Sequence, residues 1–336
     1  MKLYEISAII MKIGFCTTFI TNAFFLTLTI FYTKKITGTY RKMLATFATT
    51  CIVFSALEVI SQPSIHNFNG GMIYFSLNSS SVISQKFQTI AIIVWSACYA
   101  SQLVFIAIQF LFRYVTLIGH PIRKSFQGWL QVIWIFYFLG MGMAYGTIVY
   151  NCLGADDYSD TYFKEEILTV YNRDIKETPR VLEVPYDSKG GLRWKVIIYF
   201  CSEFIILDSQ YAIIIFCALK MRKAMKTELR NFSKRNRKLE TQFLKALLVQ
   251  ILLPTFLLTL PIGSVLLLPL LDIKISFQSG VIFAMYSLYP PLDSIATMVI
   301  VSEYKCSIKE FLKTLGIGDG SLKRRKSVTG NTVELS

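Results

Sequence analysis

Polar side chains recur at helical spacing inside long apolar stretches of the sequence. Three such stripes stand out: Glu203, Gln210 and Cys217; Cys98, Gln102 and Gln109; and Tyr286, Asp293 and Thr297. At these spacings, the members of each stripe lie on one face of a helix. A charge at the centre of a bilayer costs about 2.5–3.5 kcal/mol on insertion scales, so each acid there needs a partner or a purpose.

Two interpretations of these stripes stay open. In the first, the faces enclose a cavity whose outer half binds a small molecule. The candidate ligand-binding residues are then Tyr99, Gln102, Glu203, Gln210 and Tyr286. In the second, the same groups form hydrogen bonds between helices, worth about 0.6 kcal/mol each on average. Glu203, near the outer surface, favours a cavity. Asp293 lies deeper and favours a switch or packing role.

A second candidate site lies at the opposite ends of the same stretches. Arg113-Tyr114 ends an uncharged stretch, either as an ordinary positive charge on the inner side or as a contact that holds helices closed and then engages a cytoplasmic partner. Pro254 and Pro261 predict bends in a single helix, because proline removes a backbone donor. With Asp293 and Tyr304, these residues are the candidate switch residues.

No arrangement of residues typical of an enzyme or a metal site is present. The sequence has 2 His and 7 Cys, without a Cys-x-x-Cys, His-Glu-x-x-His, phosphate-loop or nucleophile-elbow motif. We therefore predict no catalytic residues, no metal and no cofactor. The net charge of +14 comes from basic residues between apolar stretches, which indicates a membrane surface as partner and not nucleic acid.

Seven apolar stretches are long enough to cross a bilayer, which takes about 20 residues. They predict an all-α membrane protein, a bundle of seven transmembrane helices. The predicted spans are 13–32, 43–62, 87–112, 126–151, 196–219, 246–271 and 276–302. Tryptophan and tyrosine, 4 and 18 in number, suit anchors at the membrane interface.

The charges predict how the bundle is oriented. Most of the 35 Lys and Arg fall between spans one and two, three and four, five and six, and after span seven. The opposite segments, above all 152–193, hold most of the acids. Since short cytoplasmic loops are enriched in Lys and Arg, the N-terminus is expected outside and the C-terminus in the cytoplasm. Asn78 is then a candidate glycosylation site in an outer loop.

The receptor domain is expected to cover 1–315 and to end in a surface helix. Within 305–315, Ile308, Phe311, Leu312 and Leu315 follow the amphipathic spacing, which predicts a helix on the inner leaflet in contact with lipid. Cys306 beside the membrane is a candidate for palmitoylation. Residues 316–336, with a basic run, are expected to form a disordered tail.

Several short motifs together carry a family resemblance. They are Gly38-Thr39-Tyr40-Arg41, Pro63 and His66, Arg113-Tyr114, Leu244-Lys245-Ala246-Leu247 with Gln250, Pro254 and Pro261, Tyr289-Pro290, Leu292-Asp293 and Tyr304-Lys305. This set resembles the nematode seven-transmembrane serpentine chemoreceptors of the Str class, which are G-protein-coupled receptors. The chain departs from the family pattern at Ser294, where proline is usual, and at Lys305, where arginine is usual.

The resemblance implies a chemosensory receptor in the plasma membrane, in the cilium of a sensory neuron. Such a receptor binds a small odorant or soluble cue and activates a heterotrimeric G protein. Two alternatives remain. A ligand-gated cation channel of the insect-odorant-receptor type also has seven spans, but its N-terminus is cytoplasmic, against the charge distribution. A small-molecule transporter built from inverted halves would show an internal repeat, and none stands out.

Overall fold

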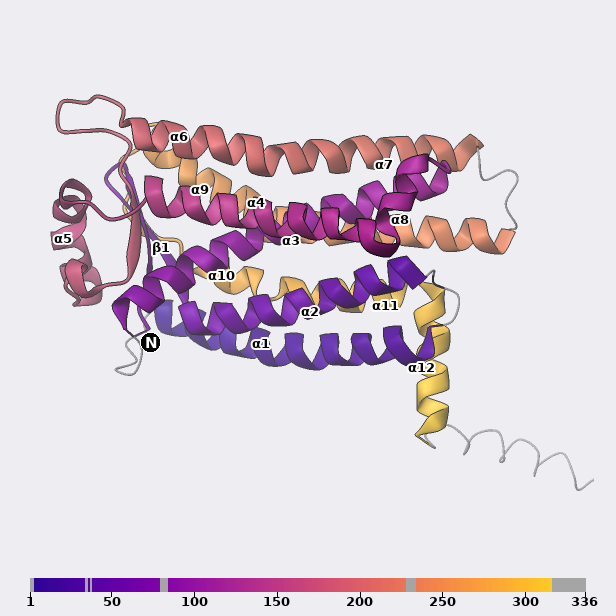
Figure 1. The fold of residues 1–336 in the computed structure, drawn as a ribbon. Coiled ribbons are helices and arrows are strands. Elements are labelled where there is room, and N and C mark those ends of the chain that lie inside the picture. The colour runs from indigo at the N-terminus through magenta and orange to yellow at the C-terminus, as the bar shows by residue number, and fades with distance from the viewer. Residues whose placement is uncertain (1–2, 34–35, 37, 79–83, 228–233, 316–336) are drawn as a thin grey trace, which may run out of the picture.

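The computed structural model describes residues 3–33, 36, 38–78, 84–227 and 234–315. The predicted tail, 316–336, lies outside the described residues. The helices run roughly parallel in one bundle, with a small sheet and a short helix covering one end and a helix lying across the other (Figure 1). The helices are α1 Leu3–Thr27, α2 Gly38–Ser61, α3 Gln85–Leu117, α4 Gln131–Cys152, α5 Asp157–Tyr171, α6 Trp194–Glu203, α7 Ser209–Thr227, α8 Lys234–Pro254, α9 Leu260–Leu270, α10 Val281–Tyr286, α11 Tyr289–Ile300 and α12 Ser302–Thr314.

Three of the long helices contain a π-helical turn, which links α-helical pieces into one continuous stretch. The turns are Leu28–Tyr32 after α1, Phe204–Asp208 between α6 and α7, and Thr255–Thr259 between α8 and α9. Short 3-10 turns lie at 121–126, 128–130 and 175–177. Six helical stretches in the described residues are long and apolar enough to cross a membrane: 3–32, 38–61, 85–117, 128–152, 194–225 and 237–270.

The predicted seventh span, 276–302, is broken in the structure. It consists of a short strand, then α10 and α11, separated by a turn at 287–288. The break follows from Pro290 and Pro291, which lie in the first turn of α11. Proline has no N–H to donate to the carbonyl four residues earlier, and its ring clashes with that carbonyl. Neither piece alone is long enough to span, so this segment differs from the single helix that the sequence suggested.

The outward faces of the bundle are apolar. Large side chains such as Ile20, Phe31, Phe136, Phe204 and Ile215 are each more than half exposed. A soluble protein rarely presents so much contiguous apolar surface. These faces are suited to contact with lipid acyl chains.

Glycines on α4 allow it to approach α3 closely. A Cβ atom at Gly142 would lie 1.9 Å from the Oγ of Ser101, and one at Gly146 would lie 3.1 Å from the Cβ of Ala97. Small residues four apart are a common device for close packing of membrane helices, because they let two backbones meet. The third glycine of the helix, Gly140, has open space beside it.

A four-stranded antiparallel sheet, which the sequence analysis did not predict, covers one end of the bundle. Its strands are β1 Pro63–Phe68, β2 Gly71–Ser76, β3 Arg180–Glu183 and β4 Phe277–Gln278, in the order β3-β2-β1-β4. β1 and β2 form a hairpin around Asn69 and Gly70, whose positive φ angles of 45° and 79° suit a tight hairpin turn. The sheet joins three segments that are distant in sequence, while all seven cysteines are unpaired.

The two faces of this sheet contact different parts of the molecule. On one face, Ile65, Met72, Tyr74 and Val181 join the core of the bundle. On the other, Ile73, Phe75 and Leu182 pack with residues of α5 such as Phe163. Alternate side chains of a strand point to opposite faces, so the hairpin lies between the bundle and α5.

Polar contacts fix α5 over the sheet. His66 donates from Nε2 to Glu166 at 2.9 Å, and its Nδ1 accepts from the Tyr171 hydroxyl at 3.2 Å, a tautomer inferred from the two partners. Burial lowers the pKa of His66, although Glu166 acts in the opposite direction. On β3, Arg180 donates from Nε and Nη2 to both carboxylate oxygens of Asp160 at 2.7 and 2.6 Å.

At the other end, α12 leaves the bundle at a steep angle (Figure 1). Its apolar side contacts the end of α1, where Phe311 packs edge-on against Phe24 and Tyr32 at ring-centroid distances of 5.4 and 5.5 Å. Leu312 and Leu315 remain exposed. Helix α12 thus leaves the bundle with one apolar side partly covered by the end of α1.

Candidate functional site

A cavity of about 410 Å³ lies directly beneath the sheet. This volume falls in the range of about 300–1,000 Å³ that is usual for small-molecule sites. Helices α3, α4, α6 and α9 form its walls, and β1 and β2 close the end that faces the sheet. The wall residues are mostly aromatic or aliphatic, among them Tyr74, Trp95, Tyr145, Tyr199 and Phe283.

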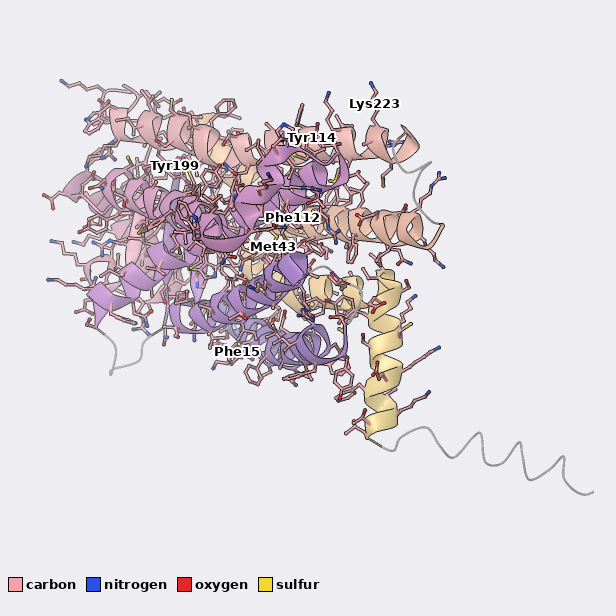
Figure 2. The ribbon with its side chains drawn as sticks, turned by 45° about the vertical axis from the view of Figure 1, so that its right-hand side comes forward. Phe15, Met43, Phe112, Tyr114, Tyr199 and Lys223 are labelled. Atoms are coloured by element: carbon pink, nitrogen blue, oxygen red, sulfur yellow. The ribbon has the colours of Figure 1, made fainter. Side chains whose placement is uncertain are left out.

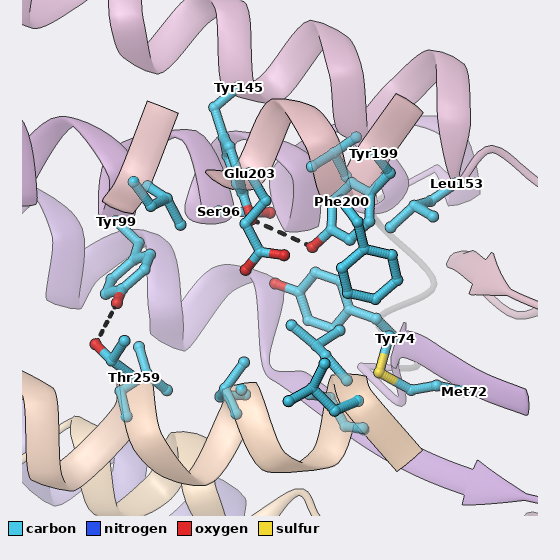
Figure 3. A pocket seen from close by; sticks show the side chains of 18 of the residues that line it. Met72, Tyr74, Ser96, Tyr99, Tyr145, Leu153, Tyr199, Phe200, Glu203 and Thr259 are labelled. Carbon is cyan, nitrogen blue, oxygen red and sulfur yellow. Dashed lines mark hydrogen bonds between the residues drawn. The ribbon is translucent and has the colours of Figure 1, made fainter. Parts of the chain in front are cut away.

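A small number of polar groups converge on this cavity (Figure 3). The Tyr99 hydroxyl lies 2.6 Å from the Thr259 hydroxyl, which also lies 2.8 Å from the hydroxyl of Tyr211. These bonds connect α3, α7 and the π-helical turn of 255–259. The hydroxyls of Tyr145 and Tyr199 are 3.4 Å apart. An apolar cavity with few oriented polar groups is typical of a site that selects one kind of small ligand.

The cavity opens to the side, between α6 and α9. Phe204 and Leu267 line it and are also 68% and 47% exposed on the outside of the bundle. Asp208 lies at the same opening and is exposed. The sheet covers the end of the bundle that is nearest to the cavity. The exposed side of the cavity is therefore the one between α6 and α9.

Two of the five candidate ligand-binding residues line the cavity, namely Tyr99 and Glu203. Figure 3 shows the Glu203 carboxylate pointing into the space between the helices. Gln102 and Tyr286 lie deeper, where the Tyr286 hydroxyl donates to Oε1 of Gln102 at 3.4 Å. They border a separate space of only about 10 Å³.

Gln210 lies away from the cavity and is fully buried. Its amide is hydrogen-bonded to the Tyr137 hydroxyl of α4 at 2.9–3.1 Å. The sequence analysis placed Gln210 and Glu203 on one face, but the π-helical turn Phe204–Asp208 lies between them. Such a turn holds an extra residue, so it rotates the residues that follow relative to those that precede it.

The second candidate site lies at the far end of α3, where Arg113 is 6% exposed. Its guanidinium stacks between two rings, 3.5 Å from the centroid of Tyr40 and 3.9 Å from that of Phe243. Its Nη1 donates to both carboxylate oxygens of Glu240 on α8 at 3.3 and 3.4 Å. Arg113 therefore connects α2, α3 and α8.

Little room remains beside this contact. The space bordered by Arg113, Met221, Glu240 and Leu244 has a volume of about 10 Å³. Figure 2 places Tyr114 and Lys223 at this end of the bundle and Tyr199 toward the sheet. Tyr114 packs edge-on against Phe216 of α7 at 6.0 Å between ring centroids.

The remaining switch candidates lie along the helices between the two sites. Pro254 is the last residue of α8, and Pro261 lies in the first turn of α9, so they flank the π-helical turn. Asp293 of α11 is buried, and its Oδ1 has no hydrogen-bond partner in the described part of the chain. The Tyr304 hydroxyl lies 2.8 Å from that of Thr29.

Two surface candidates are also placed. Asn78 follows β2, and its side-chain nitrogen donates to the carbonyl of Ile60 at 3.0 Å. The nitrogen that would carry a sugar thus already has a protein partner. Cys306 of α12 is exposed.

Sequence reasoning missed two acids at these sites. Glu183 of β3 is completely buried, and neither of its carboxylate oxygens has a hydrogen-bond partner in the described residues. Burial raises the pKa of Glu183 well above its usual value, and the charge of Glu203 raises it further. Glu240 lay in a basic segment and carried no distinguishing signal. Glu183 lies in the run Arg180-Val181-Leu182-Glu183-Val184, which shows no regular alternation, so no pattern in the sequence marked it.

Comparison with known proteins identifies the family. The sequence profile described as "Serpentine type 7TM GPCR chemoreceptor Str" matches residues 7–309. The chain is 36% identical to the G-protein coupled receptor str-33 of Caenorhabditis elegans over 315 residues, 92% of this chain and 91% of that protein. It is 25% identical to the serpentine receptor class r-10 of the same organism, over 82% of each chain.

The fold is similar to that of squid rhodopsin, with a TM-score of 0.59 over 99% of this chain and 92% of that one, at 14% identity. These proteins are named as receptors and not as enzymes, as the sequence predicted. With six apolar helices in the part of the chain that the structure describes, it is a multi-pass membrane protein. It belongs to the Str family of serpentine G-protein-coupled chemoreceptors.

Proposed function

We propose that this receptor binds a small odorant or soluble chemical cue in the cavity beneath the sheet and then activates a heterotrimeric G protein at the Arg113 end. In this proposal α10 and α11 together form the seventh span. The N-terminus and the sheet lie outside the cell, and α12 lies along the cytoplasmic leaflet. A sensory cilium is the proposed location, by analogy with the family.

One observation carries this proposal: a single helical stretch contacts both sites. In the stretch of α8, the π-helical turn and α9, Thr259 and Leu266 line the cavity, while Glu240 and Phe243 hold Arg113. A ligand that changes the position of α9 therefore changes the contacts of Arg113. Pro254 and Pro261 flank the turn at which such a stretch bends most readily.

The proposed action is a shift between two states of the receptor. In the closed state, Glu240 and the two rings hold Arg113, and the space beside it is too small for a partner. In the open state, α8 moves away and Arg113 becomes available to the G protein. A ligand favours the open state only by the difference in its affinity for the two states.

Charge and shape support the proposed orientation. Arg123, Lys124 and the basic residues of α7 and α8 lie toward the Arg113 end, whereas the segment that contains α5 is rich in acids. Lys and Arg gather on the cytoplasmic side of membrane proteins. Exposed Leu312 and Leu315 on α12 suit contact with lipid on that side.

The test is G-protein activation in a heterologous cell that is challenged with a broad panel of volatile and water-soluble compounds. An N-terminal tag measures how much receptor reaches the surface. We expect at least one compound to activate the receptor and Arg113→Ala to abolish the response at equal surface level. The matched control is Arg123→Ala, which removes an exposed arginine nearby. If the two variants respond alike, Arg113 has no special role in coupling.

A further inference from the structure

The inner face of the sheet brings a buried acid to the cavity. Met72 pairs directly with Glu183 across β2 and β3, and directly opposed residues of antiparallel strands point to the same face. Met72 and Tyr74 of that face line the cavity. The side chain of Glu183 therefore lies on the face of the sheet that is turned toward the bundle, next to Met72 of the cavity wall, and not on the face that contacts α5.

A second acid approaches from α6. Glu203 lines the cavity directly, and its charge raises the pKa of Glu183. The wall residues include Glu203 and Asp208 but, within the described chain, no lysine, arginine or histidine. Two carboxylates thus lie near one another without a basic side chain in the wall to compensate them.

The nearby arginines are held elsewhere. Arg180 lies on the outer face of the sheet and pairs with Asp160 of α5. Arg193 pairs with Asp156 at the start of α5. A buried carboxyl group without a basic partner avoids the cost of a buried charge by staying protonated, in line with the raised pKa of Glu183, and a cation beside it would favour its ionised form.

The rest of the wall suits a cation with an apolar body. The rings of Tyr74, Trp95, Tyr99, Tyr145, Tyr199 and Phe283 border the space. The face of an aromatic ring attracts a cation, and cages of such rings recognise quaternary ammonium groups. Aliphatic side chains of the π-helical turn 255–259 and of α9, such as Leu258 and Ile262, line the opposite wall.

We propose that the ligand of this cavity is a small organic cation, a protonated amine or quaternary ammonium with an aromatic or aliphatic body, whose charged nitrogen lies between Glu203 and Glu183. The inference rests on the proposed function in one respect, that the cavity is the ligand site. It adds the chemical class of the ligand.

The test uses the purified full-length receptor and measures binding without a G protein. The melting temperature is followed with increasing concentrations of matched compounds: phenethylamine against phenethyl alcohol, cyclohexylmethylamine against cyclohexylmethanol, and phenethyltrimethylammonium. Each pair keeps the apolar body and changes the charge. We expect each amine to bind roughly tenfold or more tightly than its alcohol, as an ion-paired hydrogen bond is worth more than a neutral one.

Variants of the two acids test where the charged nitrogen of the ligand binds. Glu203→Gln and Glu183→Gln each should weaken amine binding roughly tenfold and leave alcohol binding unchanged. The matched control is Glu165→Gln, which removes an exposed acid of α5 and should change neither. If a glutamine variant does not fold, the comparison of amine with alcohol on the unaltered receptor still decides the question.

Equal binding of amines and alcohols would overturn the inference, and so would the absence of binding by every amine and ammonium compound tested. Unchanged amine binding in both glutamine variants would place the cation elsewhere and overturn it too. The melting assay does not depend on signalling. Amine binding without G-protein activation would therefore leave this inference standing and refute the proposed function, and the reverse result would do the opposite.

Discussion

Replacing Glu240 by glutamine should activate the receptor without a ligand. In the structure, Glu240 holds Arg113 on α3 through both carboxylate oxygens, while Tyr40 and Phe243 enclose the guanidinium. Glutamine has nearly the same size and keeps one acceptor oxygen, so packing around α8 is preserved. Only the charge is lost, and that loss weakens the closed state.

The size of the effect follows from how buried the pair is. The Arg113 side chain is 7% exposed and that of Glu240 31% exposed. Exposed ion pairs contribute about 0.2–1 kcal/mol, whereas breaking a buried pair costs about 3–5 kcal/mol. For this partly buried pair we expect about 1–2 kcal/mol, a factor of about 5–30 in the ratio of open to closed receptor.

The assay is ligand-free nucleotide exchange on a co-expressed G protein, divided by the surface level of an N-terminal tag. Glu165→Gln on α5 makes the same change of charge at the far end of the bundle and serves as the control. Glu240→Asp, which keeps the charge on a shorter side chain, should give an intermediate rise. A basal rate in Glu240→Gln equal to that of the control would refute the idea that this pair holds the receptor closed.

Two further predictions concern stability, measured as the melting temperature of the purified receptor. Gly142→Ala should destabilise it by about 1–3 kcal/mol, because the new Cβ would clash with Ser101 on α3, whereas Gly140→Ala should have little effect since space is open there. The second prediction concerns the contribution of His66 to stability at acidic pH. Burial holds the pKa of His66 below its usual value of about 6.5, so the contribution of His66 to the free energy of unfolding is complete above that pH and falls as the pH drops below it. When the pH is lowered from about 7.5 to about 5.5, the melting temperature of the unaltered receptor should therefore fall relative to that of His66→Gln measured at the same two pH values, and an identical pH dependence of the two proteins would exclude this role of His66.

Apolar length and charge made much of the bundle predictable. An uninterrupted apolar stretch can satisfy its backbone in a bilayer only as a helix or in a closed barrel, so stretches such as 87–112 indicated helices directly. Polar residues inside a predicted span also indicated candidate sites, because burying a charge in the membrane costs free energy. Glu203 was singled out because an acid inside a span needs a reason, and the structure places it in the cavity wall.

The sheet could have been predicted only in part. Asn69-Gly70 between two short apolar runs is a strong local hairpin signal, and the structure forms β1 and β2 around it. The pairing of β2 with β3 and of β1 with β4 joins residues far apart in the chain. Local sequence patterns do not show which distant strands will pair, so the position of Glu183 opposite Met72 on the inner face of the sheet could not be predicted from spacing.

Helical spacing failed at one point for a physical reason. A seven-residue interval places two side chains on one face only if the helix between them is regular. Glu203 and Gln210 are seven apart, but the π-helical turn between them sends the first into the cavity and the second toward Tyr137 of α4. The same kind of turn lies at Thr255–Thr259, where Thr259 joins the polar network of the cavity. These irregular turns frequently occur at functional sites. In this receptor, both turns lie in the helices that border the side opening, so the residues that shape the cavity are the ones that regular periodicity places least well.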